Sequence, residues 1–354
     1  MTDLFIEGVA LDASWRDRDR SLTDLIFDAV RAAIDDSGQP LEGIDSVVLA
    51  AHDLVDGRSL SSMVTAPAAA AYLRDEIRYG DDGAGAFAAA MTRLEAGHNR
   101  RTIVAGWGRA SEHDVDAVSH GLFDPFFGRP VGLDELAVSA LRAQAWIQRH
   151  GTAGRDAAWR RRRERAARNP RAVTQSGVQQ SAPYPLRPEE LPVWADFAVA
   201  VVMSTEPAGV KVAGMGQSSD PYHLGDRDLV GMPALVDAAG KALADAGAAL
   251  SDVEVVELDA LTGFDEALAV EALGLAEPGS AFGYLAEHDS VNPSGGCAAG
   301  YCAPAMGLAR IVEATLQLRG TAGPVQQDAP RRALATGSST IGSQTQTAIV
   351  LEAA

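Results

Sequence analysis

Apolar residues recur at helical spacing near the start of the chain and then give way to a short, almost continuous apolar run. Between Ser21 and Asp36 they form one stripe, made of Leu22, Leu25, Ile26, Ala29, Val30, Ala33 and Ile34. This period predicts a helix that Ser21 caps and Gly38 ends. The run at 44–50, IDSVVLA, predicts a buried strand. Such strands, when they alternate with helices, are typical of a parallel sheet covered on both faces.

The same pattern returns in the second half of the chain. Residues 28–49 (DAVRAAIDDSGQPLEGIDSVVL) align without a gap with residues 237–258 (DAAGKALADAGAALSDVEVVEL). The identical pairs include Asp28/Asp237, Ala29/Ala238, Ala33/Ala242, Asp36/Asp245, Gly38/Gly247, Leu41/Leu250 and Leu49/Leu258. Helix, terminal glycine, acidic residue and strand all fall in register. We therefore predict an internal duplication, with one α/β half over about 1–205 and the other over 206–354.

A second pair of segments supports the duplication. Residues 81–108 (DDGAGAFAAAMTRLEAGHNRRTIVAGWG) predict a glycine turn, a helix that ends at Gly97, and a strand. Residues 294–320 (SGGCAAGYCAPAMGLARIVEATLQLRG) predict a glycine turn and a helix, and RALATG at 332–337 predicts the strand. Small residues before each helix allow a ligand or another helix to approach the backbone closely.

Residues 112–195 fit neither half and predict an insertion that lies over the sheet, where ligand-covering segments are common. Its aromatic residues form part of a lid or, alternatively, the insertion's own small core. They are Phe123, Phe126, Phe127, Trp146 and Trp159. The consecutive arginines at 160–163 point all round a helix, which predicts a solvated or ion-paired surface. WADFAVAVVM (194–203) predicts a strand that returns to the core.

Charge and composition exclude several classes of protein. The formal net charge is −18, with a sequence pI near 4.7, and such a field repels nucleic-acid phosphates. No apolar run has the roughly 20 residues that a membrane-spanning helix needs, and the N-terminus does not resemble a signal peptide. Cys297 and Cys302 are the only cysteines, too few for a disulfide scaffold. A cytoplasmic, metal-free enzyme or binding protein is the resulting expectation.

Motifs in the second half resemble the thiolase superfamily, and most closely the thiolases of the sterol-carrier-protein type. VELDALTGFDEALAVEALGL (256–275) is similar to that group's E-L-H-D-C-F-T…E-A-L-G-L segment. NPSGGCAAGYCAPAMG (292–307) is similar to N-x-x-G-G…G-H-P-x-G-A-x-G, and ARNPRA (167–172) to the N-P segment of the insertion. The resemblance covers nearly the whole chain. It implies a five-layer α-β-α-β-α fold, acyl-CoA thioester substrates without a tightly bound cofactor, and pairing with a second thiolase-like chain as homodimer or heterodimer.

The catalytic residues of the family are replaced at each matching position. Where thiolases have the nucleophilic Cys of a C-x-x-G turn, this chain reads D-G-A-G and places Asp82. Leu258 replaces the His of the H-D-C-F segment and leaves Asp259 in register with its Asp. Tyr301 replaces the His of G-H-P and is followed by Cys302. A carboxylate is a poor substitute for a thiolate in attacking a thioester, so ordinary thiolysis is disfavoured.

Retro-aldol cleavage of a β-hydroxyacyl-CoA breaks the same Cα–Cβ bond without an acyl-enzyme. The resemblance extends to the steroid side-chain-cleaving aldolases of the superfamily, which have a Tyr at this position and a small OB-fold and zinc-ribbon subunit. It implies proton transfer by Tyr301 and a supporting acid at Asp259. A Tyr can act as a base when its neighbours lower its pKa from about 10. Backbone N–H groups that hold the thioester are expected around Ser294, Gly295, Gly296 and Gly300.

Each candidate residue also has a structural interpretation. Tyr301 can fill the space of the lost His, Asp82 can cap the next helix, Asp259 can bond backbone, and Cys302 can be a packed core thiol. Two alternatives to the lyase therefore stay open: a catalytically silent thiolase-like subunit, and an acyltransferase that uses Cys302. The lyase predicts a cavity at Tyr301 with room for a thioester, and the silent subunit predicts a filled one.

Overall fold

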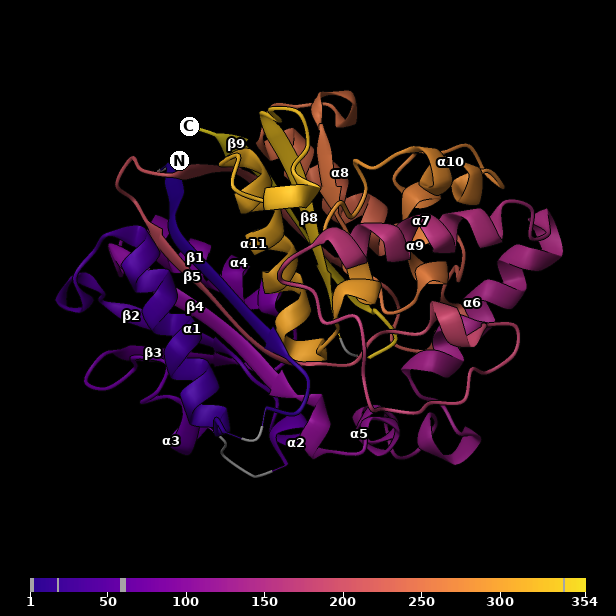
Figure 1. Cartoon of the computed structure of the whole chain (residues 1–354), viewed down its shortest axis with the longest axis horizontal. Coiled ribbons are helices and arrows are strands. Elements are labelled where there is room, and N and C mark those ends of the chain that lie inside the picture. The colour runs from indigo at the N-terminus through magenta and orange to yellow at the C-terminus, as the bar shows by residue number, and fades with distance from the viewer. Residues whose placement is uncertain (1–2, 18, 58–61, 340) are drawn as a thin grey trace.

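The strands of the described residues form one nine-stranded sheet in the order β3-β2-β4-β5-β1-β6-β9-β8-β7 (Figure 1). The structure is a computed structural model that describes residues 3–17, 19–57, 62–339 and 341–354. One set of strands is β1 (Leu4–Ser14), β2 (Ser46–Ala50), β3 (Asp75–Tyr79), β4 (Arg101–Arg109) and β5 (Asp196–Ser204). The other set is β6 (Val210–Ser219), β7 (Val255–Glu257), β8 (Arg332–Ser338) and β9 (Thr345–Ala353). The two sets meet where β1 and β6 pair over only three residues each, Leu4–Ile6 against Val210–Val212.

The sheet is mixed rather than parallel, which corrects the expectation from the apolar runs. β2 runs parallel to β3 and β4, and β7 runs parallel to β8. β5 instead lies antiparallel between β1 and β4, and β9 lies antiparallel between β6 and β8. All nine residues of β5 are buried. A buried run therefore identified these strands, but burial on both faces does not fix strand direction.

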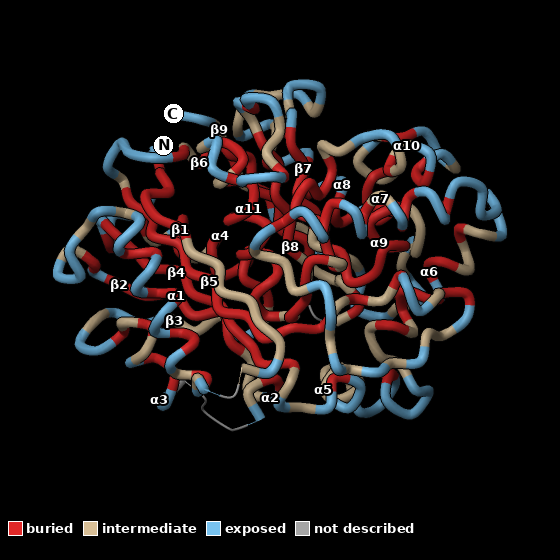
Figure 2. The backbone as a smooth tube through the Cα atoms, viewed as in Figure 1, coloured by how far each residue is buried: buried red, intermediate tan, exposed pale blue. Residues whose placement is uncertain are grey.

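Helices cover and divide the sheet in five layers. In the first half they are α1 (Leu22–Ser37), α2 (Asp53–Asp56), α3 (Ser62–Thr65) and α4 (Gly83–Glu95). In the second half they are α8 (Pro233–Asp245), α9 (Gly263–Ala272), α10 (Ala281–Glu287) and α11 (Met306–Leu318). α4 and α11 pack together in one buried cluster with side chains of both strand sets, while α1 and α8 cover the outer faces (Figure 2). The predicted five-layer α/β fold is confirmed.

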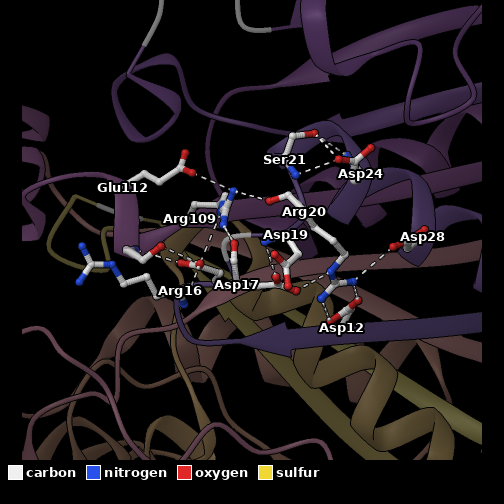
Figure 3. A network of polar contacts seen from close by, with 12 residues as sticks. Asp12, Arg16, Asp17, Asp19, Arg20, Ser21, Asp24, Asp28, Arg109 and Glu112 are labelled. Carbon is white, nitrogen blue, oxygen red and sulfur yellow. Dashed lines mark hydrogen bonds and ion pairs between the residues drawn. The ribbon is translucent and has the colours of Figure 1, made fainter.

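The first helix forms as its sequence predicts. The Ser21 side chain accepts a hydrogen bond from the Asp24 N–H, and Gly38 ends the helix at φ 67°. The seven residues of the predicted apolar stripe are the seven buried residues of α1. Beside this helix, Arg109 at the end of β4 donates to the carbonyl oxygens of Asp17 and Arg20, at 2.5 and 3.0 Å (Figure 3). This network fixes the chain where it leaves β4 and enters the insertion.

The insertion folds mainly as α5 (Val115–Leu122), α6 (Glu135–His150) and α7 (Arg155–Arg168). Of these, α6 and α7 pack on the second half, whereas α5 contacts α2 of the first half. Trp146 lies 5.6 Å from the ring of Phe264 and 5.0 Å from that of Phe282, and Trp159 lies 5.6 Å from Phe282. These two tryptophans therefore belong neither to a lid nor to a separate core, but to a core shared with α9 and α10.

The arginine run at 160–163 was expected to form a solvated or ion-paired surface. Arg161 and Arg162 are ion-paired, but Arg162 is buried rather than on the surface. Arg162 and Arg165 are 3% and 1% exposed, because α7 lies against α10 and the loop before α11. Arg162 pairs with Glu266 of α9 and lies 5.1 Å from the ring of Trp159. Arg163, the next residue of the helix, is exposed.

Candidate active site

Asp82 joins the starts of the two central helices. Its Oδ2 accepts hydrogen bonds from the N–H groups of Ala84 and Gly85 at 2.9 and 3.4 Å, so it caps α4. Its Oδ1 accepts from the Gly307 N–H at 3.0 Å, at the start of α11. The capping interpretation therefore describes its contacts. Burial and the neighbouring carboxylates Asp259 and Asp81 nevertheless raise the pKa of Asp82 well above its usual value.

Asp82 is enclosed by backbone on the side of the second half. A Cβ added at Gly307 would lie 2.4 Å from its Oδ1, and one added at Gly337 would lie 2.2 Å from its Oδ2. Both glycines are needed because no side chain fits between the carboxylate and the backbone of α11 or β8. Asp82 is 3% exposed and does not line the pocket described below. Its position is suited to holding two helices and to acting on the site through its charge.

The loop at 292–307 is fixed by polar side chains of the second half. Asn292 accepts a hydrogen bond from the Leu258 N–H at 2.6 Å, and Ser294 donates to Glu257 at 2.7 Å. Arg310 of α11 donates to the Ser294 hydroxyl at 2.8 Å. These bonds leave little freedom to the backbone that carries Tyr301.

Tyr301 is the predicted residue that faces the pocket most clearly. Its backbone bridges to the segment before β5, where its N–H donates to the Val193 carbonyl at 2.8 Å. Its ring is 7% exposed, lines the pocket and packs edge-to-face on Trp194 at 5.4 Å. In the described part of the chain its hydroxyl has no hydrogen-bond partner. The side chain is thus held by its backbone and ring, and its polar end is open to a ligand.

The electrostatics of Tyr301 differ from the expectation. Burial raises the pKa of Tyr301 well above its usual value, and the acids Asp259, Glu135, Asp82 and Asp265 raise it further. The neighbours therefore do not lower the pKa, as a phenolate base would need. Tyr301 is a neutral phenol at physiological pH, and a neutral phenol is a hydrogen-bond donor.

Asp259 lies behind the same pocket wall. Its Oδ2 accepts hydrogen bonds from the N–H and hydroxyl of Ser338 at 3.0 and 3.1 Å, and its own N–H donates to the Thr336 hydroxyl. Its Oδ1 is buried and has no hydrogen-bond partner among the described residues. Burial raises the pKa of Asp259 to about 6, although Arg310 and the Ser338 bonds oppose the shift. These contacts agree with the interpretation that Asp259 bonds the backbone. Its free oxygen leaves open the alternative that Asp259 acts as an acid.

The pocket at Tyr301 lies between the insertion and the second half. One wall is the apolar face of α5 with Val115, Val118 and Leu122, and the other holds Tyr301 with the serines that follow β8. The space for water-sized molecules is about 30 Å³, which holds only two or so waters. A cavity exists at the predicted place, but it is too narrow for an acyl thioester in this conformation.

Two residues of the insertion with ionisable side chains line this pocket and were not among the candidates from the sequence. Glu135 begins α6 and accepts a hydrogen bond from the Gly342 N–H at 2.8 Å. His113 follows β4, and burial lowers its pKa. From the sequence alone His113 is an ordinary surface histidine, whereas here it is half-buried. No motif marks either residue, because only the packing of the insertion brings them to the site.

Cys302 lines the pocket with an unreactive thiol. A Cβ added at Gly108 of β4 would lie 2.3 Å from its Sγ, so the thiol fills a space that the glycine leaves. Burial and the carboxylates of Asp196 and Asp56 raise the pKa of Cys302 strongly. A thiol must ionise to act as a nucleophile, so the electrostatics oppose the acyltransferase interpretation.

The predicted thioester-binding loop makes its contacts away from the pocket. Gly295 and Gly300 have φ of 101° and 123°, and added Cβ atoms would lie 2.5 Å from Ala166 and 2.8 Å from the Phe197 ring. Gly296 has φ 57° and lies close to Asn292 and Glu266. Ser294 is bonded to Glu257 and Arg310. The described pocket is not lined by any of these four, so their role in thioester binding stays a prediction.

Comparisons with known proteins agree with this architecture. Residues 216–352 match the family model "Thiolase C-terminal domain-like". An acetyl-CoA acetyltransferase from Methanothermobacter thermautotrophicus is 27% identical over 92% of this chain and 93% of its own. Sterol carrier protein 2 from Gallus gallus is 37% identical over 114 residues, 30% of this chain and 21% of that protein.

A solved structure extends the likeness of the fold to the whole chain. The structure entitled "Ltp2-ChsH2(DUF35) aldolase" superposes with a TM-score of 0.81 at 19% identity, over 99% of this chain and 98% of that one. The fold is therefore thiolase-like. Over residues 216–352 the chain matches the thiolase C-terminal domain, and it is similar to sterol carrier protein 2 over 114 residues. In the described part, no helix is long and apolar enough to cross a membrane.

Proposed function

We propose that the protein is a carbon–carbon lyase that cleaves a β-hydroxyacyl-CoA thioester by a retro-aldol reaction. The observation that carries the proposal is Tyr301, whose unpartnered hydroxyl opens into the pocket while the thiolase nucleophile is absent. The overall likeness to a structure named as an aldolase supports the same reaction class. No covalent acyl-enzyme is required, which suits a site whose candidate thiol resists ionisation.

The reaction needs a base and a donor to the thioester oxygen. The base takes the β-hydroxyl proton, the Cα–Cβ bond opens, and a carbonyl forms at Cβ. The bonding electrons pass to the thioester as an enolate, which a proton at Cα converts to the shorter acyl-CoA. Because Tyr301 is a neutral phenol, we assign it to donate a hydrogen bond to the enolate oxygen rather than to take the proton. Asp259 would then act through its charge or as the acid at Cα.

Because the pocket is too narrow for the substrate in this conformation, we propose that the site opens, or is completed, when a partner binds. We propose acyl-CoA as substrate, a homodimer or heterodimer with a thiolase-like chain, and a small OB-fold and zinc-ribbon subunit that completes the active complex in the cytoplasm. The nature of the acyl chain, steroid-like or other, is left to the assay. A pocket of about 30 Å³ also favours the second candidate, a catalytically silent subunit whose site is filled.

Tyr301→Phe separates these two candidates. The ring stays on Trp194 and only the donor is lost, so we expect kcat for β-hydroxyacyl-CoA cleavage to fall about 100- to 1,000-fold, as for loss of an oxyanion donor. The assay uses the chain with any protein that co-purifies with it. Tyr284→Phe, which removes the hydroxyl of a tyrosine stacked on His288 away from the pocket, is the matched control. An equally stable Tyr301→Phe with the wild-type rate would support the silent subunit.

A further inference from the structure

One face of α6 is directed at the candidate site. Glu135, Ser139 and Arg142 are spaced four and three residues apart, so they share a helix face. Ser139 donates to Asp265 of α9 at 2.6 Å, and Arg142 lies 3.5 Å from the other oxygen of that carboxylate. This face therefore docks on the second half and carries Glu135 to the pocket at its N-terminal end.

The Glu135 carboxylate is held by one oxygen only. Its Oε1 accepts from the Gly342 N–H at 2.8 Å, and Arg142 donates to the Gly342 carbonyl at 2.9 Å. Both ends of this glycine are thus fixed by the same helix. The second carboxylate oxygen of Glu135 has no hydrogen-bond or ion-pair partner in the described residues. A positioned carboxylate with one free oxygen in a pocket has the geometry of a general base.

We propose that Glu135 is the catalytic base of the lyase, a role that rests on the proposed retro-aldol function. Its free oxygen takes the β-hydroxyl proton, the O–H electron pair forms the carbonyl at Cβ, and the Cα–Cβ pair moves into the thioester enolate. Tyr301 donates a hydrogen bond to the enolate oxygen, and Cα is then protonated by the Glu135 carboxyl or by water. The sum is one β-hydroxyacyl-CoA converted to a carbonyl compound and a shorter acyl-CoA, with no oxidant or co-reactant.

Other acids of the site are less well placed to act on a substrate. Four acids raise the pKa of Tyr301, and among them Glu135 is the one that lines the pocket. Asp82 is enclosed by Gly307 and Gly337, and Asp259 is bound to Ser338 behind the wall. Glu135 is therefore assigned as the base, because among these acids it has both a free oxygen and access to the cavity.

The environment of Glu135 suits the task. Burial raises its pKa to about 8, aided by Asp265 and Asp81 and opposed by Arg142 and the Gly342 N–H. A base with a pKa near the working pH is strong enough to take a proton and is still partly ionised. His113, which also lines the pocket, has a lowered pKa and would titrate below 6.5.

The pH dependence of kcat/KM for β-hydroxyacyl-CoA cleavage tests the assignment in the wild-type chain. We expect activity to rise through a limb near pH 8, because Glu135 must be deprotonated. Glu135→Gln should lose this limb and fall about 100- to 10,000-fold in kcat/KM, with the Gly342 bond kept by the amide oxygen. Asp134→Asn is the matched control, because it removes a charge one residue earlier while Asn can still cap α6.

The outcomes separate this inference from the function on which it rests. A wild-type complex that cleaves β-hydroxyacyl-CoA with no limb near pH 8, or a folded Glu135→Gln that keeps rate and profile, overturns Glu135 as the base and leaves the lyase standing. A limb below pH 6.5 that His113→Gln removes would assign the base to His113 instead. A wild-type complex that cleaves no β-hydroxyacyl-CoA overturns both the lyase and its base.

Discussion

Two groups of buried or half-buried carboxylates near the loop that carries Tyr301 differ in whether a cation accompanies them. In the paired group, each carboxylate has an arginine within ion-pair distance. These pairs are Arg310–Glu257, Arg162–Glu266 and Arg171–Glu313. In the unpaired group, Asp82, Asp259 and Glu135 have no ion-pair partner among the described residues and rely on N–H and O–H donors.

The difference shows which buried charge serves the fold and which is free for chemistry. The paired group holds the loop in place through hydrogen bonds from Asn292 and Ser294, and it holds α7 through the Arg162–Glu266 ion pair. In the unpaired group, burial raises the pKa of Asp259 to about 6 and that of Glu135 to about 8. Burial also raises the pKa of the paired Glu257 to about 7, so the groups are separated by the cation rather than by the direction of the pKa shift. Groups with pKa values displaced toward neutrality inside a pocket are typical of proton-transfer sites.

The largest loss of stability is expected when an ion pair of the paired group is removed. Arg162→Met removes the nearer of two cations that face Glu266 and leaves this buried carboxylate with Arg165 alone, at 3.9 Å. Loss of one partner of a buried ion pair typically costs about 3 to 5 kcal/mol in the free energy of unfolding. Denaturant-induced unfolding measures the loss. Arg163→Met, on the exposed side of the same helix, is the control and should change stability by less than about 0.5 kcal/mol.

An Arg162→Met protein as stable as its control would contradict the comparison. The arginine would then be no more than a side chain packed against Trp159, and its pairing with Glu266 would not hold α7 on the second half. Glu266→Gln removes the other partner and should lower stability in the same direction.

In the unpaired group, a substitution of Asp259 is expected to change the free energy of unfolding less, and in the stabilising direction. The pKa of Asp259 is raised to about 6 in the fold from its usual value of 3.8, so its ionisation destabilises the native state as the pH rises through this window. Asp259→Asn removes that cost and should raise the free energy of unfolding by about 1 to 3 kcal/mol at pH 8, with little gain near pH 4. Unfolding curves at both pH values measure it. If Asp259→Asn is equally destabilising at both, the carboxylate is structural and the comparison fails.

The sequence predicts the framework better than the site, for physical reasons. The apolar stripe of α1 and the Asp82 cap depend on neighbours a few residues away, so local spacing specifies them. Tyr301 and Asp259 were found because motifs around them resemble a family. Glu135 and the burial of Arg162 depend on how the insertion packs on the second half, which no local pattern encodes. The antiparallel strands were missed because burial on both faces does not fix the direction of a strand.

The smallest change in stability is expected from the loss of one hydrogen bond in the unpaired group. The Ser338 hydroxyl donates to Asp259 Oδ2 at 3.1 Å, in a site where such donors take the place of a cation. Ser338→Ala removes a bond that favours the charged form, so the pKa of Asp259 should rise further above about 6. The variant should therefore lose about 0.5 to 1.5 kcal/mol of stability at pH 8 and less near pH 4, where the carboxyl is protonated in both proteins. Unfolding at the two pH values, with NMR titration of the Asp259 carboxyl, measures the shift. A pKa of Asp259 that stays unchanged would mean that the backbone N–H of Ser338 and the distant Arg310 suffice, and that the unpaired group is closer to the paired one than its geometry indicates.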